Sequence, residues 1–425
     1  MVIDTKSLEI LNPWWANPHA HEQDPHLIAV LNKPWYFDHP IKKELQFQMG
    51  HSFLIRGPRQ IGKTTLMKEL IARAISLDGV KAAHCLFLTC EAIENYSELQ
   101  QILVDWLKAK QHERLFLCLD EITFVEEWQR GILWLLNSGL LRKSFLLISG
   151  SNARDLKKMA ERFPGRNVKE VSLFPLSLRD YAGLPCFQHI DAHARFQIYL
   201  EVGGFPHAIR DYCQLGGVSD ETYETYANWI FGDAHRFELS RDILVHIMFR
   251  IFDTLTSQVT YQRLIEKSPV KSHETAAAYV AHLELAFLCH VLGCYDPDKD
   301  MEAPRKAKKI YFIDPLLYAV AGGLLRGLKN IFEWWKNQLQ DSEMKGKVFE
   351  AVVVNHFARK YKRVYSWYSS NTQREADILV REGERLRLYE VKSSMQTVPP
   401  ILGKQVDIIT PEKFYDFSST QEKTY

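Results

Sequence analysis

Short apolar runs alternate with longer amphipathic stretches along the first half of the chain. The runs predict strands at residues 52–56, 84–89, 115–119, 145–149 and 170–173. The stretches between them predict helices, such as one over residues 66–74. Because this alternation builds a parallel sheet covered on both faces, residues 48–181 are predicted to form an α/β core. Residues 1–47 contain several Trp, Pro and His residues and are expected to be an ordered lead-in that packs on this core.

The pattern changes after residue 181. Residues 182–235 are predicted to be helical, with an interruption at Gly203-Gly204-Phe205-Pro206. Residues 236–326 contain predicted helices followed by two strands; the helices are at 240–258, 261–267 and 274–286, and the strands at 287–295 and 309–313. Helices followed by such a hairpin predict a winged helix.

Residues 327–425 have a third pattern. They combine one long predicted helix at 342–361, a hairpin at 375–392 and a strand near 406–409. This mixture is α+β and distinct from the first region. The chain is thus predicted to hold an α/β core, an α-helical and winged-helix module, and an α+β C-terminal domain.

Composition places the chain among ordinary globular proteins. It has 425 residues, 46% of them hydrophobic and 25% charged, and a net charge of +1, so any basic surface must be local. The N-terminus lacks a basic-then-apolar signal pattern, and no apolar run reaches the ~18 residues that span a bilayer. The nearest candidate, residues 316–325, is too short. We therefore expect a cytoplasmic protein without a membrane partner.

The seven cysteines form no C-x-x-C pair. Cys85 and Cys90, like Cys289 and Cys294, lie five residues apart inside apolar segments, which favours buried free thiols over zinc ligands. An odd number of cysteines without a secretory signal indicates a reducing compartment.

A phosphate-binding loop pattern, G-x-x-x-x-G-K-[ST], follows the first predicted strand. It comprises Gly57, Pro58, Arg59, Gln60, Ile61, Gly62, Lys63, Thr64 and Thr65. Glycines let the backbone aim its N–H groups at a phosphate, Lys63 adds a charge for the β- and γ-phosphates, and Thr64 offers a hydroxyl to Mg²⁺. The predicted helix behind the loop points its N-terminus at the same place. The sequence therefore predicts ATP binding; the alternative is a glycine-containing turn with an incidental lysine.

The strand predicted at 115–119 is followed by two acids. Asp120 is expected to hold Mg²⁺ and Glu121 to polarise the attacking water, at the end of the strand where α/β sheets bind ligands. The alternative is an acid pair that starts a helix. The spacing from Gly57 to Asp120 leaves room for one extra strand, as in the additional-strand class of P-loop ATPases.

Two further roles have candidates. Asn152 or Ser151, after the next strand, is expected to lie near the γ-phosphate, unless this is a plain turn. Arg166, preferred over Arg154, is the candidate for an arginine supplied in trans to stabilise transition-state charge. Such an arginine requires a neighbouring subunit, so a homo-oligomer is a possible assembly.

The chain resembles a known family, the prokaryotic AAA-type ATPases with a C-terminal region of unknown function. The segments that carry the resemblance are GPRQIGKTT (57–65), LDEITFVEEW (119–128), SGSNARDL (149–156), FPGR (163–166), LFPLSLRDY (173–181), GGFP (203–206) and KIYFIDPLL (309–317). It covers about residues 48–394. The resemblance implies an AAA-like core, a winged helix and a nuclease-like C-terminus, and it indicates a fold and an ATPase more than a pathway.

The hairpin at 375–392 resembles the PD-(D/E)xK nuclease motif, with Asp377 first and Glu390, Val391 and Lys392 second. If Gly383 and Glu384 form a two-residue type II′ turn, Glu382 pairs with Arg385, Val380 with Arg387 and Asp377 with Glu390. Two carboxylates that face each other across a strand pair are destabilising without a cation.

A divalent metal between Asp377 and Glu390 would remove this repulsion, and oxygen ligands suit Mg²⁺. Lys392 lies on the same face as Glu390 and is expected to orient a water or stabilise charge on the phosphorus. Glu350, in the long helix, matches the acid that supports the metal in the nuclease fold. The alternative is that Lys392 neutralises the pair and the hairpin is structural. The Pro-Pro break at 397–400 departs from the helix that continues many such nucleases.

Two functions fit these patterns. The first is a Mg²⁺-dependent ATPase that couples nucleotide state to DNA binding or processing through the nuclease-like domain. Its basic hairpin near 305–309, with Arg305, Lys306 and Lys308, is expected to contact DNA phosphates. The alternatives are a solvated loop on a purely structural module and a dimer or domain interface. The second is an ATP-dependent regulatory switch or interaction protein whose nuclease-like domain is catalytically inactive.

Overall fold

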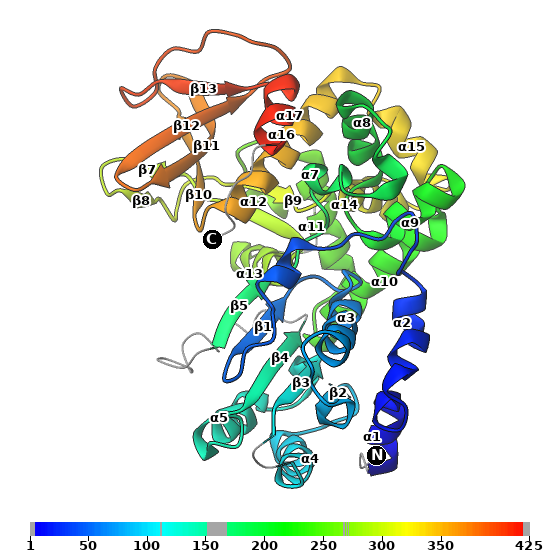
Figure 1. Cartoon of the computed structure of the whole chain (residues 1–425). Coiled ribbons are helices and arrows are strands. Elements are labelled where there is room, and N and C mark those ends of the chain that lie inside the picture. Colours follow the sequence, from blue (N-terminus) through cyan, green and yellow to red (C-terminus); the bar gives the residue numbers. More distant parts are fainter. Residues whose placement is uncertain are drawn as a thin grey trace. The chain divides into compact units, whose positions relative to one another are not determined.

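The computed structural model describes residues 5–110, 113–150, 168–266, 268, 270 and 272–419. The chain divides into two compact units, Met1–Phe174 and Pro175–Tyr425, called unit 1 and unit 2 below (Figure 1). Asn152 and Arg166, which the sequence proposes for the nucleotide site, lie outside the described residues.

Unit 1 is built on a five-stranded parallel sheet with the order β2-β3-β4-β1-β5 (Figure 1). The strands are β1 (Ser52–Arg56), β2 (Cys85–Thr89), β3 (Leu115–Asp120), β4 (Ser144–Gly150) and β5 (Val168–Ser172). The first four are buried almost throughout, as continuous apolar runs in a doubly covered sheet require. The predicted parallel α/β core is confirmed.

Helices cover both faces of this sheet. They are α3 (Lys63–Ser76), α4 (Tyr96–Lys108) and α5 (Trp128–Ser138), with short turns η4 (Ala82–His84) and η5 (Ile122–Phe124) between elements. Helices α4 and α5 share one apolar cluster with strands β2, β3 and β4. Helix α3 is not part of that cluster and packs on β2, β3 and β4 separately from it.

The lead-in is ordered and packs on the edge of the sheet, as expected. It contains α1 (Thr5–Leu11), η1 (Pro13–Trp15), η2 (Pro18–Gln23), α2 (Pro25–Ile28) and η3 (Pro40–Lys43). The buried side chain of Asn12 accepts from the backbone N–H of Phe87 and donates to its carbonyl, and the Trp14 and Trp15 indoles donate to the carbonyl of Cys85. These bonds satisfy an edge strand that would otherwise be open to pairing.

The helical part of unit 2 surrounds a buried helix, α14 (Pro315–Gly322). Its other helices and turns are α7 (Leu178–Tyr181), η6 (Pro185–Phe187), α8 (Ala192–Val202), α9 (Pro206–Leu215), α10 (Asp220–Arg236), α11 (Arg241–Asp253), α12 (Tyr261–Leu264), α13 (His273–Leu285), η7 (Leu324–Arg326) and α15 (Ile331–Gln338). All eight residues of α14 are buried, which explains the apolar run there. Among the described helices, none has the length and apolar character that a bilayer crossing requires.

The order of elements predicted for a winged helix is present. Helices α11, α12 and α13 precede an antiparallel pair, β6 (Cys289–Leu292) and β9 (Lys309–Phe312). The predicted strand at 287–295 is wrong in one respect, because it breaks at Gly293 and resumes as β7 (Tyr295–Asp296), which pairs with β8 (Met301–Glu302). The winged-helix assignment itself stays a prediction.

A four-stranded sheet with the order β10-β11-β12-β13 forms the C-terminal part of unit 2. Its elements are α16 (Ser342–Lys360), β10 (Val364–Ser369), β11 (Arg374–Glu382), β12 (Arg385–Val391), β13 (Val406–Ile409) and α17 (Pro411–Ser419). The predicted hairpin register is confirmed for two of its three pairs, Glu382 with Arg385 and Val380 with Arg387. The paired ladder begins at Ile378 and Tyr389, so the predicted pair of Asp377 with Glu390 is not part of it. Gly383, in the two-residue turn, has the positive φ of 60° that a type II′ turn needs at its first position.

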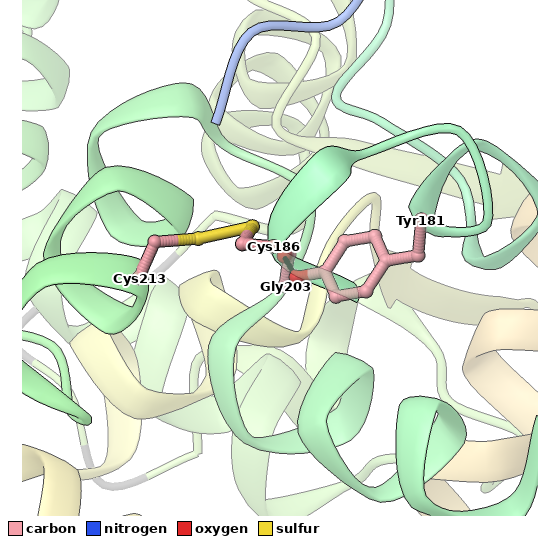
Figure 2. The surroundings of a disulfide bond; sticks show 4 residues. All are labelled: Tyr181, Cys186, Gly203 and Cys213. Carbon is pink, nitrogen blue, oxygen red and sulfur yellow. Dashed lines mark hydrogen bonds between the residues drawn. A yellow bond between two sulfur atoms is a disulfide. The ribbon is translucent and has the colours of Figure 1, made fainter. Parts of the chain in front are cut away.

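The Gly-Gly interruption at 203–204 is a packing requirement. A Cβ on Gly203 would lie 2.0 Å from Asp314 Oδ1, and one on Gly204 would lie 1.9 Å from the carbonyl oxygen of Leu176. The buried Asp314 accepts from the backbone N–H of Gly204 at 2.7 Å. Figure 2 shows the Tyr181 ring reaching toward Gly203, whose carbonyl accepts from the Tyr181 hydroxyl.

Two cysteines in the same region are joined. Cys186 in η6 and Cys213 in α9 form a disulfide, with a Cα–Cα distance of 6.2 Å (Figure 2). This disulfide differs from the reduced state that the odd number of cysteines indicated. The sequence did not reveal it, because the pairing of cysteines so far apart in the chain depends on how η6 and α9 fold together. The other five cysteines are free and buried, which confirms the expectation for Cys85, Cys90, Cys289 and Cys294.

Candidate nucleotide-binding site

The loop between β1 and α3 needs its two glycines for different reasons. A Cβ on Gly57 would lie 2.2 Å from the backbone oxygen of Leu173, so only glycine allows the two chain segments to approach. Gly62, just before α3, has open space around it but takes φ 95°, a left-handed conformation that other residues adopt at a cost. The loop is therefore held in a specific shape by packing at one end and by backbone conformation at the other.

Lys63 is the first residue of α3 and is 4% exposed. Its ammonium donates to the carbonyls of Gly57 at 3.1 Å and Pro58 at 2.9 Å, and it lies 3.6 Å from the Glu121 carboxylate. These partners keep the ammonium over the loop, next to the first N–H groups of α3, which have no partner within the helix. A phosphate placed there would meet both the lysine charge and the helix N-terminus.

The strand order brings Asp120 to the loop. Strand β4 lies between β1 and β3, so the ends of β3 and β4 meet beside the phosphate loop. The Thr64 hydroxyl donates to Asp120 Oδ2 at 2.6 Å, and the Ser149 hydroxyl donates to Asp120 Oδ1. Burial raises the pKa of Asp120, and these two hydrogen bonds oppose the rise.

Glu121 has a left-handed backbone with φ 50°. This conformation is uncommon for a residue with a side chain, and such outliers are concentrated at functional sites. Its backbone N–H donates to the Ser149 hydroxyl at 3.0 Å, which fixes the turn after β3. Ser149 thus holds both acids in place, a role that the sequence did not reveal because the serine also reads as an ordinary end of a strand.

The remaining loop residues frame the site. Pro58 and Ile61 are buried, Gln60 is exposed with φ 59°, and the Arg59 guanidinium lies over the Phe124 ring, 5.5 Å from its centroid. Thr65 is partly buried in the first turn of α3. The hydroxyl of Thr64 beside the carboxylate of Asp120 is an oxygen pair of the kind that Mg²⁺ binds together with nucleotide phosphates. The residues present therefore fit a Mg²⁺–nucleotide complex.

The acids predicted for the second site also lie together, in unit 2. Asp377 in β11 and Glu390 in β12 are one step beyond the Ile378–Tyr389 pair in the ladder, and Glu350 projects from α16. The Lys392 ammonium pairs with Glu390 at 2.7 Å. Among the described residues, no group of three or more His, Cys, Asp or Glu side chains is arranged to hold a metal ion.

One residue at this second site was missed. The ammonium of Lys309, in β9, lies 2.7 Å from Asp377 Oδ1 and 3.1 Å from Glu350 Oε1. A signal was present in the sequence, since a lysine inside an apolar strand requires a buried partner charge. The predicted roles of these acids as metal ligands stay predictions.

The hairpin near 305–309 exposes fewer basic side chains than expected. Lys308 is buried, and its ammonium donates to the carbonyl of Pro304 and to Glu302. Lys309 is fully buried as well. Only Arg305 and Lys306 of the predicted basic residues are exposed, because the two lysines turn inward to carboxylates and carbonyls.

Three family models match successive parts of the chain. Residues 50–182 match a model described as an AAA domain. Together with the parallel sheet and the phosphate loop, this match shows that the first region is similar to AAA-type P-loop domains. Residues 193–326 and 345–413 match two models that are each described as a domain of unknown function.

The chain is also similar to individual proteins at low sequence identity. An uncharacterized protein of Haemophilus influenzae is 27% identical over 270 residues, which are 57% of this chain and 62% of that protein. The ADP form of the Aeropyrum pernix ORC2 protein is 16% identical, with a TM-score of 0.36 over 79% of this chain and 95% of that one. AMPPCP-bound DnaA from Aquifex aeolicus is 16% identical, with a TM-score of 0.30 over 57% and 85%.

Proposed function

We propose that this protein is a Mg²⁺-dependent ATPase of the AAA type. The observation that carries the proposal is the Thr64–Asp120 hydrogen bond of 2.6 Å, with Glu121 as the next residue and the loop lysine 3.6 Å from it. Four residues from two separated segments thus converge on one place, in the arrangement that phosphoryl transfer to water requires.

Each residue has a distinct role in this proposal. The loop backbone and the N-terminus of α3 hold the phosphates, and the Lys63 ammonium exchanges its carbonyl partners for phosphate oxygens. Thr64 and Asp120 would hold Mg²⁺, which would neutralise charge on the phosphates when bound. Glu121 orients and polarises the attacking water. Asn152 and Arg166 remain candidates for sensing the γ-phosphate and for an arginine supplied by a neighbouring subunit.

Phosphate release by the full chain tests the proposal. Glu121→Gln should bind ATP with unchanged affinity and lose about 10²–10⁴-fold in turnover, the usual worth of a group that assists proton transfer. Glu127→Gln is a matched control, because this exposed acid lies on the same loop and pairs with Arg130 on the surface. Undiminished turnover in Glu121→Gln would remove that residue from its proposed role.

We further propose that nucleotide state is coupled to unit 2, either for DNA binding or processing or as a regulatory switch. The exposed Arg305 and Lys306 support a phosphate contact. DNA affinity of the double variant Arg305→Glu/Lys306→Glu, measured by anisotropy at several salt concentrations, tests this. If the variant binds DNA as tightly as the wild type and with the same salt dependence, the hairpin does not contact DNA.

One observation favours the switch over the nuclease. The Lys309 ammonium lies among the acids that a metal-dependent nuclease would use for its metal. Metal-dependent cleavage of DNA by the full chain, lost in both Asp377→Ala and Lys392→Ala, would reverse this preference.

A further inference from the structure

The carboxylate cluster of unit 2 already contains a cation. Lys309 is fully buried in β9, and its ammonium donates to Asp377 Oδ1 at 2.7 Å and to Glu350 Oε1 at 3.1 Å. The carboxylate of Glu375 lies 3.7 Å away. One ammonium thus contacts acids from α16 and β11, the same elements that the nuclease resemblance assigns to a metal.

Two further donors contact these acids. The Tyr311 hydroxyl donates to Glu350 Oε1 at 2.6 Å, and the Val391 backbone N–H donates to Asp377 Oδ2 at 2.9 Å. Lys309 and Tyr311 are two residues apart and so lie on the same face of β9. A single strand therefore supplies two donors to the cluster. Mg²⁺ demands oxygen ligands at about 2.0–2.1 Å in near-octahedral geometry. The acids are instead arranged around a hydrogen-bonding ammonium.

The cluster contains more acidic than basic groups. Four carboxylates, those of Glu350, Glu375, Asp377 and Glu390, are accompanied by the two ammonium groups of Lys309 and Lys392. The Oε2 atom of Glu390 is buried and has no hydrogen-bond partner among the described residues. Burial and the charge of Asp377 raise the pKa of Glu350 to about 7, as crowded like charges should. The cluster attracts cations, and the tethered one occupies it.

We propose that Lys309 is the resident cation of this cluster and that its ammonium excludes divalent metal ions from it. The residues therefore do not fit the metal that the nuclease resemblance implies. The acids serve instead to hold β9 against α16 and β11, and the cluster becomes a divalent-cation site only when the ammonium is removed. The exclusion of metal ions depends on residues of unit 2 and does not require that unit 1 hydrolyse ATP.

Mn²⁺ binding to the full chain, followed by the electron paramagnetic resonance signal of the free ion, tests the proposal. Each chain is compared with its Asp377→Asn counterpart, so that ions bound at Asp120 cancel. We expect no Asp377-dependent binding by the wild type up to about 1 mM Mn²⁺. In Lys309→Met we expect one new Asp377-dependent site whose Kd is at least about 100-fold below that concentration, because the ammonium that repels the metal ion in the buried site is gone. Lys308→Met is the matched control and should behave as the wild type.

Two results would overturn the proposal. One is wild-type binding of Mn²⁺ that Asp377→Asn abolishes, a measurement that needs no variant at Lys309. The other is a folded Lys309→Met chain that gains no Mn²⁺ site. If Lys309→Met does not fold, Lys309→Met/Glu350→Gln removes one uncompensated acid while retaining Asp377 and Glu390, and the same gain is expected of it.

Discussion

Lys63 in unit 1 and Lys309 in unit 2 are both buried lysines that lie beside carboxylates, yet their surroundings differ. Lys63 donates to two neutral backbone carbonyls and is 3.6 Å from one acid. Lys309 is surrounded by three acids and donates to two of them. Neutral partners are exchanged for a phosphate at small cost, whereas a buried lysine paired with carboxylates leaves uncompensated charge when it moves. The partners, not the residue type, therefore distinguish a ligand-binding lysine from a structural one.

The largest effect is expected at the structural lysine. Lys309→Ala should lower the free energy of unfolding by about 3–5 kcal/mol, because it leaves buried acids without their cation. Lys308→Ala, the neighbouring lysine with a single half-exposed acid partner, should cost about 1 kcal/mol or less. Urea unfolding followed by circular dichroism measures both. Equal losses in the two variants would remove the distinction drawn for Lys309.

At Lys63, the ligand-binding lysine, we expect a substitution to reduce ATP turnover strongly and stability only slightly. Lys63→Ala should reduce ATP turnover by roughly 100-fold or more, since it removes a charge aimed at the phosphates, while the urea midpoint changes little. Lys108→Ala, at an exposed position on α4, is the control for a lost surface lysine. A large loss of stability in Lys63→Ala with residual normal turnover would show that its role is structural.

The two loop glycines provide a smaller test. Gly57→Ala forces a Cβ against a backbone oxygen and should cost about 2 kcal/mol or more, because backbone cannot move aside easily. Gly62→Ala meets no atom and should cost about 1 kcal/mol for its left-handed φ. Thermal unfolding of the two variants checks the order. The same loss in both would mean that the loop relaxes around Gly57.

The smallest expected effect is a change in pH dependence. The Ser149 hydrogen bond lowers the pKa of Asp120 against the rise that burial causes, so Ser149→Ala should raise that pKa further. Mg²⁺ binding needs the ionised carboxylate, and turnover is lost as pH falls through the pKa of Asp120. The acid limb of the turnover profile should therefore move to higher pH, with less than about a ten-fold loss at neutral pH. A limb that stays in place would show that Asp120 does not set it.

Local patterns predicted most of the fold because they depend on neighbouring residues. Apolar runs placed the four buried strands of the unit 1 sheet, and the turn at Gly383 set the register of the β11–β12 hairpin. The predicted strand at 287–295 failed at Gly293, where a Cβ would lie 2.2 Å from the Glu302 side chain. The Cys186–Cys213 disulfide was not predicted either, since spacing alone does not reveal which cysteines meet.

The sequence predicted that four residues of the candidate nucleotide site lie together, whereas Asn152 and Arg166 lie outside the described residues, and the second site was predicted only in part. The sequence by itself determined that Lys63, Thr64, Asp120 and Glu121 lie close together. A phosphate loop and a strand that ends in acidic residues must both lie at the carboxyl edge of a parallel sheet. It also placed Asp377 and Glu390 on facing strands. Only the tertiary structure decided which cation these acids hold. Lys309 lies 68 residues before Asp377 in the chain, and no local rule of periodicity or turn geometry reaches that far.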